Sequence, residues 1–127
     1  MFLPEIDRDY LNEKQIIFRE VPEGANKGII IQNWQLPAGK FDHNVIELLI
    51  LLPPGYPDAP PDMFYVFPHL RLSGINRPAR AADTPFQFEN KSWQRWSRHF
   101  GAHEWRSGVD CLMTFFKKVE DSLANAQ

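Results

Sequence analysis

The chain has 127 residues, 43% of them hydrophobic, and a formal net charge of −2 at pH 7. A chain of this length can bury a real core, so we expect one domain over residues 1–127. The charge gives no electrostatic case for a nucleic-acid partner. The single cysteine, Cys111, excludes an internal disulfide framework and a cysteine-based zinc cluster, and indicates a reducing compartment.

The first ten residues, MFLPEIDRDY, do not have the pattern of a signal peptide. Pro4 and four charged residues stand where such a peptide needs an unbroken apolar run. No later segment is long and apolar enough to span a membrane. We therefore expect a cytoplasmic protein with no membrane partner. Residues 5–14 have only a weak helical pattern and predict at most one short helix.

Four apolar runs follow, and each has the composition of a strand. They are residues 15–21 (QIIFREV), 28–36 (GIIIQNWQL), 45–52 (VIELLILL) and 63–67 (MFYVF), which are rich in β-branched and aromatic side chains. Pro53 and Pro54 close the third run and Pro68 closes the fourth. Because the loops between them are short, consecutive runs favour an antiparallel four-stranded meander.

Residues 70–106 show little periodicity. Gly74, Pro78 and Pro85 interrupt them, and they contain seven Lys or Arg against three Asp or Glu. A long irregular segment inside a compact domain is commonly functional, so we expect the site to lie here. Its basic and aromatic residues make single-stranded nucleic acid only a weak alternative, because the rest of the chain is acidic.

The C-terminal residues predict an amphipathic helix, because apolar residues recur there at steps of three and four. Ser107 is a candidate N-cap, and Asp110 stands three residues later, as in a capping box. Strands followed by this helix indicate an α+β domain. The residues expected on the apolar face are Val109, Leu112, Met113, Phe116, Val119 and Leu123.

The most specific motif is LLPPGYPDAPPDMFYVFP, between the third and fourth runs. The five prolines between Pro53 and Pro61 require an extended, ordered turn, because proline fixes φ and cannot donate to a ladder. The order of strand, Tyr56-Pro57, Pro60-Pro61 and strand resembles the loop of ubiquitin-conjugating (E2) enzymes. The resemblance extends from about residue 15 onward. It implies the E2-like (UBC) fold: an antiparallel four-stranded meander, this proline-rich loop, an irregular active-site segment and a C-terminal helix.

In E2 enzymes the catalytic cysteine follows a histidine-proline-asparagine element and precedes a tryptophan by about eight residues. Here Pro68 and His69 stand in the reverse order without the asparagine, and 27 residues separate His69 from Ser97. Counting back eight residues from Trp105 places Ser97 at the position of the cysteine. The pattern is most similar to prokaryotic E2 family E, whose members lack a cysteine at the usual position.

This resemblance implies a carrier of a bacterial ubiquitin-like protein. The implied partners are an E1-like adenylating enzyme, the ubiquitin-like protein itself and a JAB-type peptidase, commonly encoded together in antiviral defence clusters. The resemblance further implies that the carrier accepts the C-terminus of the ubiquitin-like protein and passes it to an amine.

A serine in this position needs an adjacent base, since its hydroxyl is not ionised at neutral pH. His99 is two residues from Ser97 and His103 is six residues away, so either is a candidate base. Arg95 and Arg98 flank the serine and are candidates for stabilising an oxyanion. The expected site is Ser97, His99 and His103, with His69, Arg95, Arg98 and Trp105 in supporting positions.

Cys111 is the alternative nucleophile. It falls in the first turn of the predicted helix, where the helix dipole favours a thiolate, although a buried, unreactive cysteine is the commoner case. His99 and His103 have the i, i+4 spacing of metal ligands on a helix, but Gly101 between them weakens a helix. We therefore predict no metal. The lack of a phosphate-binding glycine loop predicts no nucleotide cofactor.

A second function, of a different class, also fits the sequence. A catalytically inactive E2-like module would bind the ubiquitin-like protein or the E1-like enzyme without forming a covalent bond. The sequence WSRH at residues 96–99 favours the enzyme. A scaffold does not require a serine flanked by arginines and a histidine at the position of the nucleophile.

Overall fold

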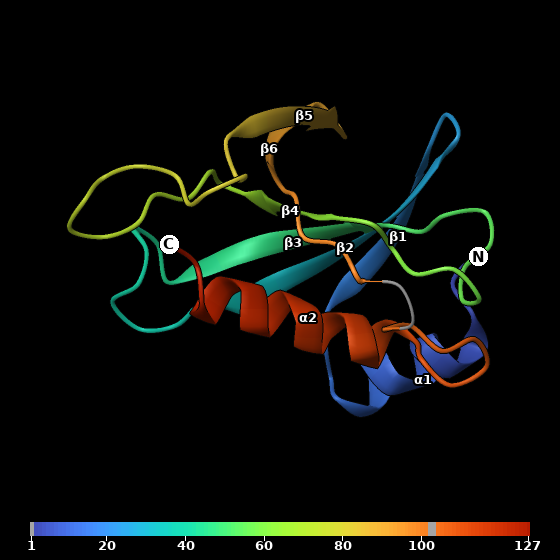
Figure 1. Ribbon diagram of the computed structural model, residues 1–127. Coiled ribbons are helices and arrows are strands. Elements are labelled where there is room, and N and C mark those ends of the chain that lie inside the picture. The colour runs from blue at the N-terminus through green and yellow to red at the C-terminus, as the bar shows by residue number, and fades with distance from the viewer. Residues whose placement is uncertain (1, 102–103) are drawn as a thin grey trace.

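The apolar runs form neighbouring strands of a single curled sheet, and a long helix lies across one face of it (Figure 1). The computed structural model describes residues 2–101 and 104–127. Every pair of neighbouring strands is antiparallel, and the order is β1-β2-β3-β4-β6-β5. The elements are α1 (Glu5–Glu13), β1 (Phe18–Glu23), β2 (Asn26–Gln35), β3 (Val45–Leu51), β4 (Phe64–Phe67), β5 (Thr84–Phe88), β6 (Lys91–Trp96) and α2 (Leu112–Ala124).

The four predicted strands exist and pair as a meander, with bounds shifted by at most three residues. β1 begins at Phe18 because α1 closes first: Gln15 has a φ of 57°, and the N–H of Ile16 donates to the Leu11 carbonyl. The weak helical pattern near the N-terminus also forms a helix, α1, which buries Asp7 and Leu11.

The predicted number of strands was too small. Residues 70–106 contain the hairpin β5–β6, and β6 pairs with β4. The hairpin escaped sequence analysis because its turn residues, Glu89 and Asn90, both have positive φ (52° and 59°), whereas the usual sequences for such a turn contain glycine. Pro85 also argues against a strand, but β5 is at the sheet edge, where proline is tolerated. The described residues of the α+β domain therefore form six strands.

Helix α2 begins later than predicted. Its N-cap is Cys111 and not Ser107; the Ser107 hydroxyl donates instead to Asp58 of the proline-rich loop (2.5 Å). Val109 and Met113, expected on the apolar face, are 61% and 54% exposed. The buried residues of the helix are Leu112, Phe115, Phe116, Val119 and Leu123.

The main core lies between α2 and the sheet. Trp96, the last residue of β6, is fully buried and stacks on Phe64 of β4 with 5.5 Å between the ring centroids. Phe41 packs edge-on against the same indole. Because large aromatic rings bury much apolar area, this cluster anchors the end of β6.

A smaller core lies on the opposite face of the sheet. Phe88 and Trp93 of the hairpin are buried there. Gly28 of β2 permits the close approach of Phe88, since a Cβ at this position would lie 2.6 Å from Phe88 Cζ. The hairpin therefore folds back over β2, on the side of the sheet away from α2 (Figure 1).

An ion pair ties the hairpin turn to β1. Arg19 donates to both carboxylate oxygens of Glu89, and this hydrogen bonding is the main cause that lowers the pKa of Glu89. The N–H of Glu89 donates in turn to the Glu23 carboxylate (2.9 Å). These contacts hold Glu89 in the positive-φ conformation that the turn requires.

Glu89→Gln is expected to reduce the loss of stability in acid. Because the pKa of Glu89 is lower in the folded state than in the unfolded chain, the Arg19 pair stabilises the fold above the ordinary glutamate pKa. This contribution is lost as the pH falls through the lowered value. We expect the Arg19–Glu89 pair to contribute at most about 1 kcal/mol to the free energy of unfolding, since both side chains are partly exposed. Urea unfolding at neutral and acidic pH measures it, with the exposed Glu13→Gln as control. Identical pH dependence in wild type and Glu89→Gln would contradict it.

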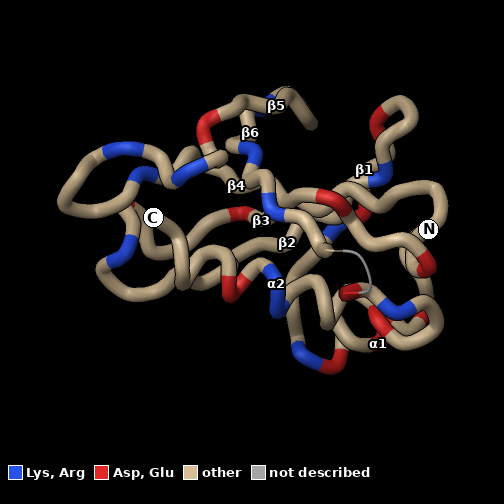
Figure 2. Tube along the Cα trace, in the orientation of Figure 1, with Lys and Arg blue, Asp and Glu red and all other residues tan. Residues whose placement is uncertain are grey.

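Charges of both signs occur throughout the fold. Lys and Arg are interleaved with Asp and Glu along the trace in Figure 2. Some of them form ion pairs, such as Arg8 with Glu20 and Lys91 with Glu47, both at 2.7 Å. In the part of the chain that the structure describes, no helix has the length and apolar character needed to cross a membrane.

Candidate functional site

The pairing of β4 with β6 brings the two segments of the candidate site together. Phe64 and Trp96 are partners at one end of this ladder. Asp62, just before β4, and Ser97, just after β6, therefore lie beyond the same end. The N–H of Ser97 donates to the carbonyl of Ala81 (3.0 Å), which fixes the chain where it leaves the sheet.

Ser97, His99 and Asp62 are joined by hydrogen bonds, and we call them the triad. Ser97 Oγ is 2.9 Å from His99 Nε2, and His99 Nδ1 is 2.6 Å from Asp62 Oδ1. The side chains of His99 and Asp62 are 51% and 70% exposed, so solvent and a large partner can both reach them. The structure thus brings together the predicted serine and one predicted base, and adds a carboxylate.

The carboxylate of Asp62 decides which nitrogen of His99 carries the proton. An ionised carboxylate only accepts hydrogen bonds, so Nδ1 is the protonated nitrogen. Nε2 then directs its lone pair at Ser97 Oγ and accepts the hydroxyl proton. This is the order of atoms in a serine-histidine-aspartate triad, in which histidine is the general base for serine.

The proline-rich loop is held against the segment after β6. The indole N–H of Trp105 donates to the carbonyl of Pro57 (2.9 Å), and its ring packs on Tyr56 with 6.4 Å between centroids. Pro61 is buried directly before Asp62, and its fixed φ limits the freedom of the backbone there. The loop therefore presents Asp62 from a constrained position.

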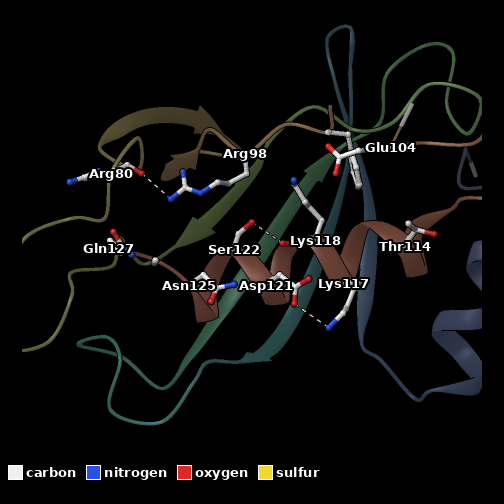
Figure 3. A pocket seen from close by; sticks show the side chains of 12 residues that line it. Arg80, Arg98, Glu104, Thr114, Lys117, Lys118, Asp121, Ser122, Asn125 and Gln127 are labelled. Atoms are coloured by element: carbon white, nitrogen blue, oxygen red, sulfur yellow. Dashed lines mark hydrogen bonds and ion pairs between the residues drawn. The ribbon is translucent and has the colours of Figure 1, made fainter. Parts of the chain in front are cut away.

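Arg98 forms a hydrogen bond with the backbone carbonyl of Ser97 and not with its hydroxyl. The guanidinium donates to the carbonyls of Ser97 (3.1 Å) and Arg80 (2.9 Å) and lies 5.0 Å from the Trp96 ring centroid. Burial lowers the pKa of Arg98. Figure 3 shows this side chain extended towards Arg80 above α2. Arg98 thus has a positioning role in this geometry.

A groove of about 560 Å³ runs along α2 beside the site (Figure 3). Basic and acidic side chains both line it, among them Arg98, Lys118 and Glu104. None of the triad residues does, so the groove and the triad are separate features. Within residues 2–101 and 104–127, no three His, Cys, Asp or Glu side chains are grouped to hold a metal ion.

In the described part of the chain, neither Arg95 nor His69 forms a hydrogen bond with the Ser97 hydroxyl. Arg95 is opposite Tyr65 in the β4–β6 ladder; burial raises the pKa of Tyr65, and the charge of Arg95 opposes that shift. His69 Nε2 lies 3.1 Å from the carbonyl of Ser92, near the start of β6. Ser97 follows the other end of that strand, roughly 16 Å away by the strand rise per residue. We therefore leave both residues out of the proposed catalytic group.

Cys111, the alternative nucleophile, is the half-buried N-cap of α2. Its N–H donates to the hydroxyl of Thr114 (3.3 Å). The carboxylate of Asp7 accepts the N–H of the next residue, Leu112 (3.0 Å). These contacts hold the backbone at the start of α2 and make Cys111 part of its capping structure. His103, the second candidate base, lies outside the described residues.

Asp62 is the member of the triad that the sequence analysis missed. It stands 37 residues before His99. The only local feature of the sequence that singles it out is its position between the double proline and a strand. The β4–β6 pairing brings it to the site, and β6 was not predicted. Knowing that β6 is a strand beside β4 would have been enough to find it.

A protein-family comparison matches almost the whole chain. The model of prokaryotic E2 family E matches residues 3–126. This span includes the proline-rich loop, β6 and the triad. No curated protein and no solved structure matches the chain.

Proposed function

The chain belongs to prokaryotic E2 family E, and from this premise we propose that it is a carrier in ubiquitin-like conjugation with Ser97 as its acceptor. The carrier takes the C-terminus of a ubiquitin-like protein from an E1-like adenylating enzyme and passes it to an amine. The observation that carries the proposal is the 2.9 Å contact between Ser97 Oγ and His99 Nε2, because a serine nucleophile needs a base in contact with it.

The transfer takes place in two steps on Ser97. In the first, Oγ bonds to the carbonyl carbon of the C-terminus while the bond to the E1-like enzyme breaks. His99 Nε2 takes the hydroxyl proton and gives it to the leaving group. In the second, the amine nitrogen bonds to that carbon, the ester bond breaks, and the proton released by the amine returns to Oγ through His99. Asp62 keeps the imidazole in the tautomer that both steps need.

The exposure of the site supports a protein-sized acyl group. A carrier meets an enzyme, a ubiquitin-like protein and a target in turn, and a deep pocket would exclude them. Ser97 instead follows the end of a strand, and the His99 and Asp62 side chains are more than half exposed. The buried Trp96 beside it supplies the rigidity that a nucleophile needs.

Cys111 is less suited to be the acceptor. Its side chain is half-buried and takes part in the capping box that starts α2. The proposal accordingly assigns the covalent step to Ser97.

We expect an adduct on Ser97 when the chain is mixed with its E1-like enzyme, its ubiquitin-like protein and ATP. Intact mass spectrometry of wild type, Ser97→Ala and Cys111→Ala measures it. The adduct should survive reducing agent, because it is an oxyester, and should be removed by hydroxylamine. Ser97→Ala should lack it entirely, and Cys111→Ala should retain it.

Two results would contradict this proposal. An adduct lost only in Cys111→Ala, and sensitive to reducing agent, would move the nucleophile to the N-cap of α2. No adduct in any variant, while the E1-like enzyme forms its own, would favour the catalytically inactive binding module.

A further inference from the structure

We propose that the triad also has a second activity, the hydrolysis of small activated esters in the absence of any partner protein. The activity goes beyond the carrier function and does not depend on it. It follows from the connectivity of the site, Ser97 Oγ to His99 Nε2 and His99 Nδ1 to Asp62 Oδ1. This connectivity contains the nucleophile, the base and the orienting carboxylate of a serine hydrolase.

A second serine-histidine pair in the chain shows what Asp62 contributes. Ser92 Oγ lies 3.4 Å from His69 Nε2, but that nitrogen also lies 3.1 Å from the Ser92 carbonyl. A carbonyl only accepts, so Nε2 of His69 carries a proton and cannot take one from the hydroxyl. Asp62 imposes the opposite tautomer on its histidine. The two pairs, one near each end of β6, therefore form a matched comparison.

The triad is held in place from both sides. Trp96 and Phe64, partners at the end of the β4–β6 ladder, are both fully buried. Ser97 directly follows Trp96 in the chain, and Asp62 stands two residues before Phe64. The hydrogen bond from the Ser97 N–H to Ala81 adds a third fixed point. Such positioning on strand ends keeps the reacting groups in a productive geometry before substrate arrives.

The exposure of the site indicates the class of substrate. A hollow of about 270 Å³ is lined by Asp62, but neither Ser97 nor His99 lines it, so it does not specify the acyl chain. The exposed His99–Asp62 pair is screened by water, so the triad acts on esters with good leaving groups, such as phenols or thiols, and not on amides.

The reaction uses only the triad, the ester and water. Ser97 Oγ bonds to the acyl carbon, the bond from that carbon to the leaving group breaks, and His99 transfers the hydroxyl proton to the leaving group. A water molecule then attacks the acyl-serine while His99 takes one of its protons. The Ser97 ester bond breaks, Oγ regains the proton, and the carboxylic acid departs.

The test is hydrolysis of p-nitrophenyl butyrate by the purified chain alone. Relative to wild type, Ser97→Ala and His99→Ala should lose about 100-fold in rate. Asp62→Asn should lower kcat about tenfold with an unchanged KM and an unchanged unfolding temperature, since Asp62 is a positioning residue. All three side chains lie at the surface or beyond strand ends, so the variants are expected to fold.

Ser92→Ala and His69→Ala are the matched controls, and both should keep the wild-type rate. A fluorophosphonate probe gives a second measurement: peptide mapping should place its label on Ser97 in wild type, and His99→Ala should label far more slowly. Equal hydrolysis by wild type and Ser97→Ala, or a label on another residue, would overturn the proposal.

The two proposals fail separately. Hydrolysis that depends on Ser97, without an adduct of the ubiquitin-like protein, would remove the carrier role and leave the hydrolase. An adduct on Ser97 without ester hydrolysis would leave the carrier and remove the hydrolase.

Discussion

Replacement of Gln94 with alanine is expected to lower the free energy of unfolding by about 3–5 kcal/mol. This buried amide accepts the N–H of Leu70 (2.9 Å) and the indole N–H of Trp96 (3.0 Å) through Oε1, and donates to the Leu70 carbonyl (2.9 Å) through Nε2. Alanine leaves three buried polar groups without partners and a cavity beside them. Denaturant unfolding followed by fluorescence measures the loss.

A second variant separates the effect of the lost hydrogen bonds from the effect of the cavity, and a third serves as a surface control. Gln94→Met keeps most of the volume and none of the hydrogen bonds, so it should lose most of the same free energy. Gln35→Ala, at an exposed position of β2, should change stability by less than about 0.5 kcal/mol. A Gln94→Ala protein within about 1 kcal/mol of wild type would show that water or a neighbour satisfies the three groups.

Asp7→Ala is expected to lower the free energy of unfolding by about 2–4 kcal/mol. The buried carboxylate accepts the N–H of Leu112, the first residue of α2, at 3.0 Å and the hydroxyl of Tyr56 at 2.7 Å. One side chain of α1 thus joins the proline-rich loop to the start of α2. Its removal leaves both donors unpaired. Thermal or urea unfolding measures the effect, with Asp9→Ala, exposed on the same helix, as control.

A double-mutant cycle tests the Tyr56 part of this contact. Tyr56→Phe alone should cost about 1 kcal/mol, because it removes one hydrogen bond. In the Asp7→Ala background the same substitution should cost almost nothing, since its partner is already gone. Fully additive effects would show that the two side chains do not stabilise the fold through each other.

The fold could be predicted wherever the signal was local. The runs at residues 15–21, 28–36, 45–52 and 63–67 became β1 to β4, because continuous apolar, β-branched sequence specifies a buried strand whatever its partners. The hairpin β5–β6 could not be predicted in the same way. Its turn has no glycine, and contacts from Arg19 and Glu23 of β1 stabilise Glu89 there. Those contacts are distant in sequence.

The start predicted for α2 was wrong for a similar reason. The sequence offered Ser107 as the cap, but that hydroxyl donates to Asp58 in the proline-rich loop. The N–H of Leu112 is satisfied by Asp7, from a different helix. The N-cap itself is Cys111, paired locally with Thr114, and cysteine is not one of the usual N-cap residues. The expected apolar stripe therefore began too early and included Val109 and Met113, which are exposed.

The sequence alone determined that the chain belongs with the E2-like proteins, that its central strands form an antiparallel meander, and that Ser97 and His99 are close, because residue type and short spacing carry this information. Only the tertiary structure decided that Asp62 completes the triad, that His99 takes the tautomer of a base, and that His69 lies at the far end of β6. These features depend on the pairing of β4 with β6. That pairing joins residues 28 to 32 positions apart in the sequence, and nothing in either segment specifies its partner.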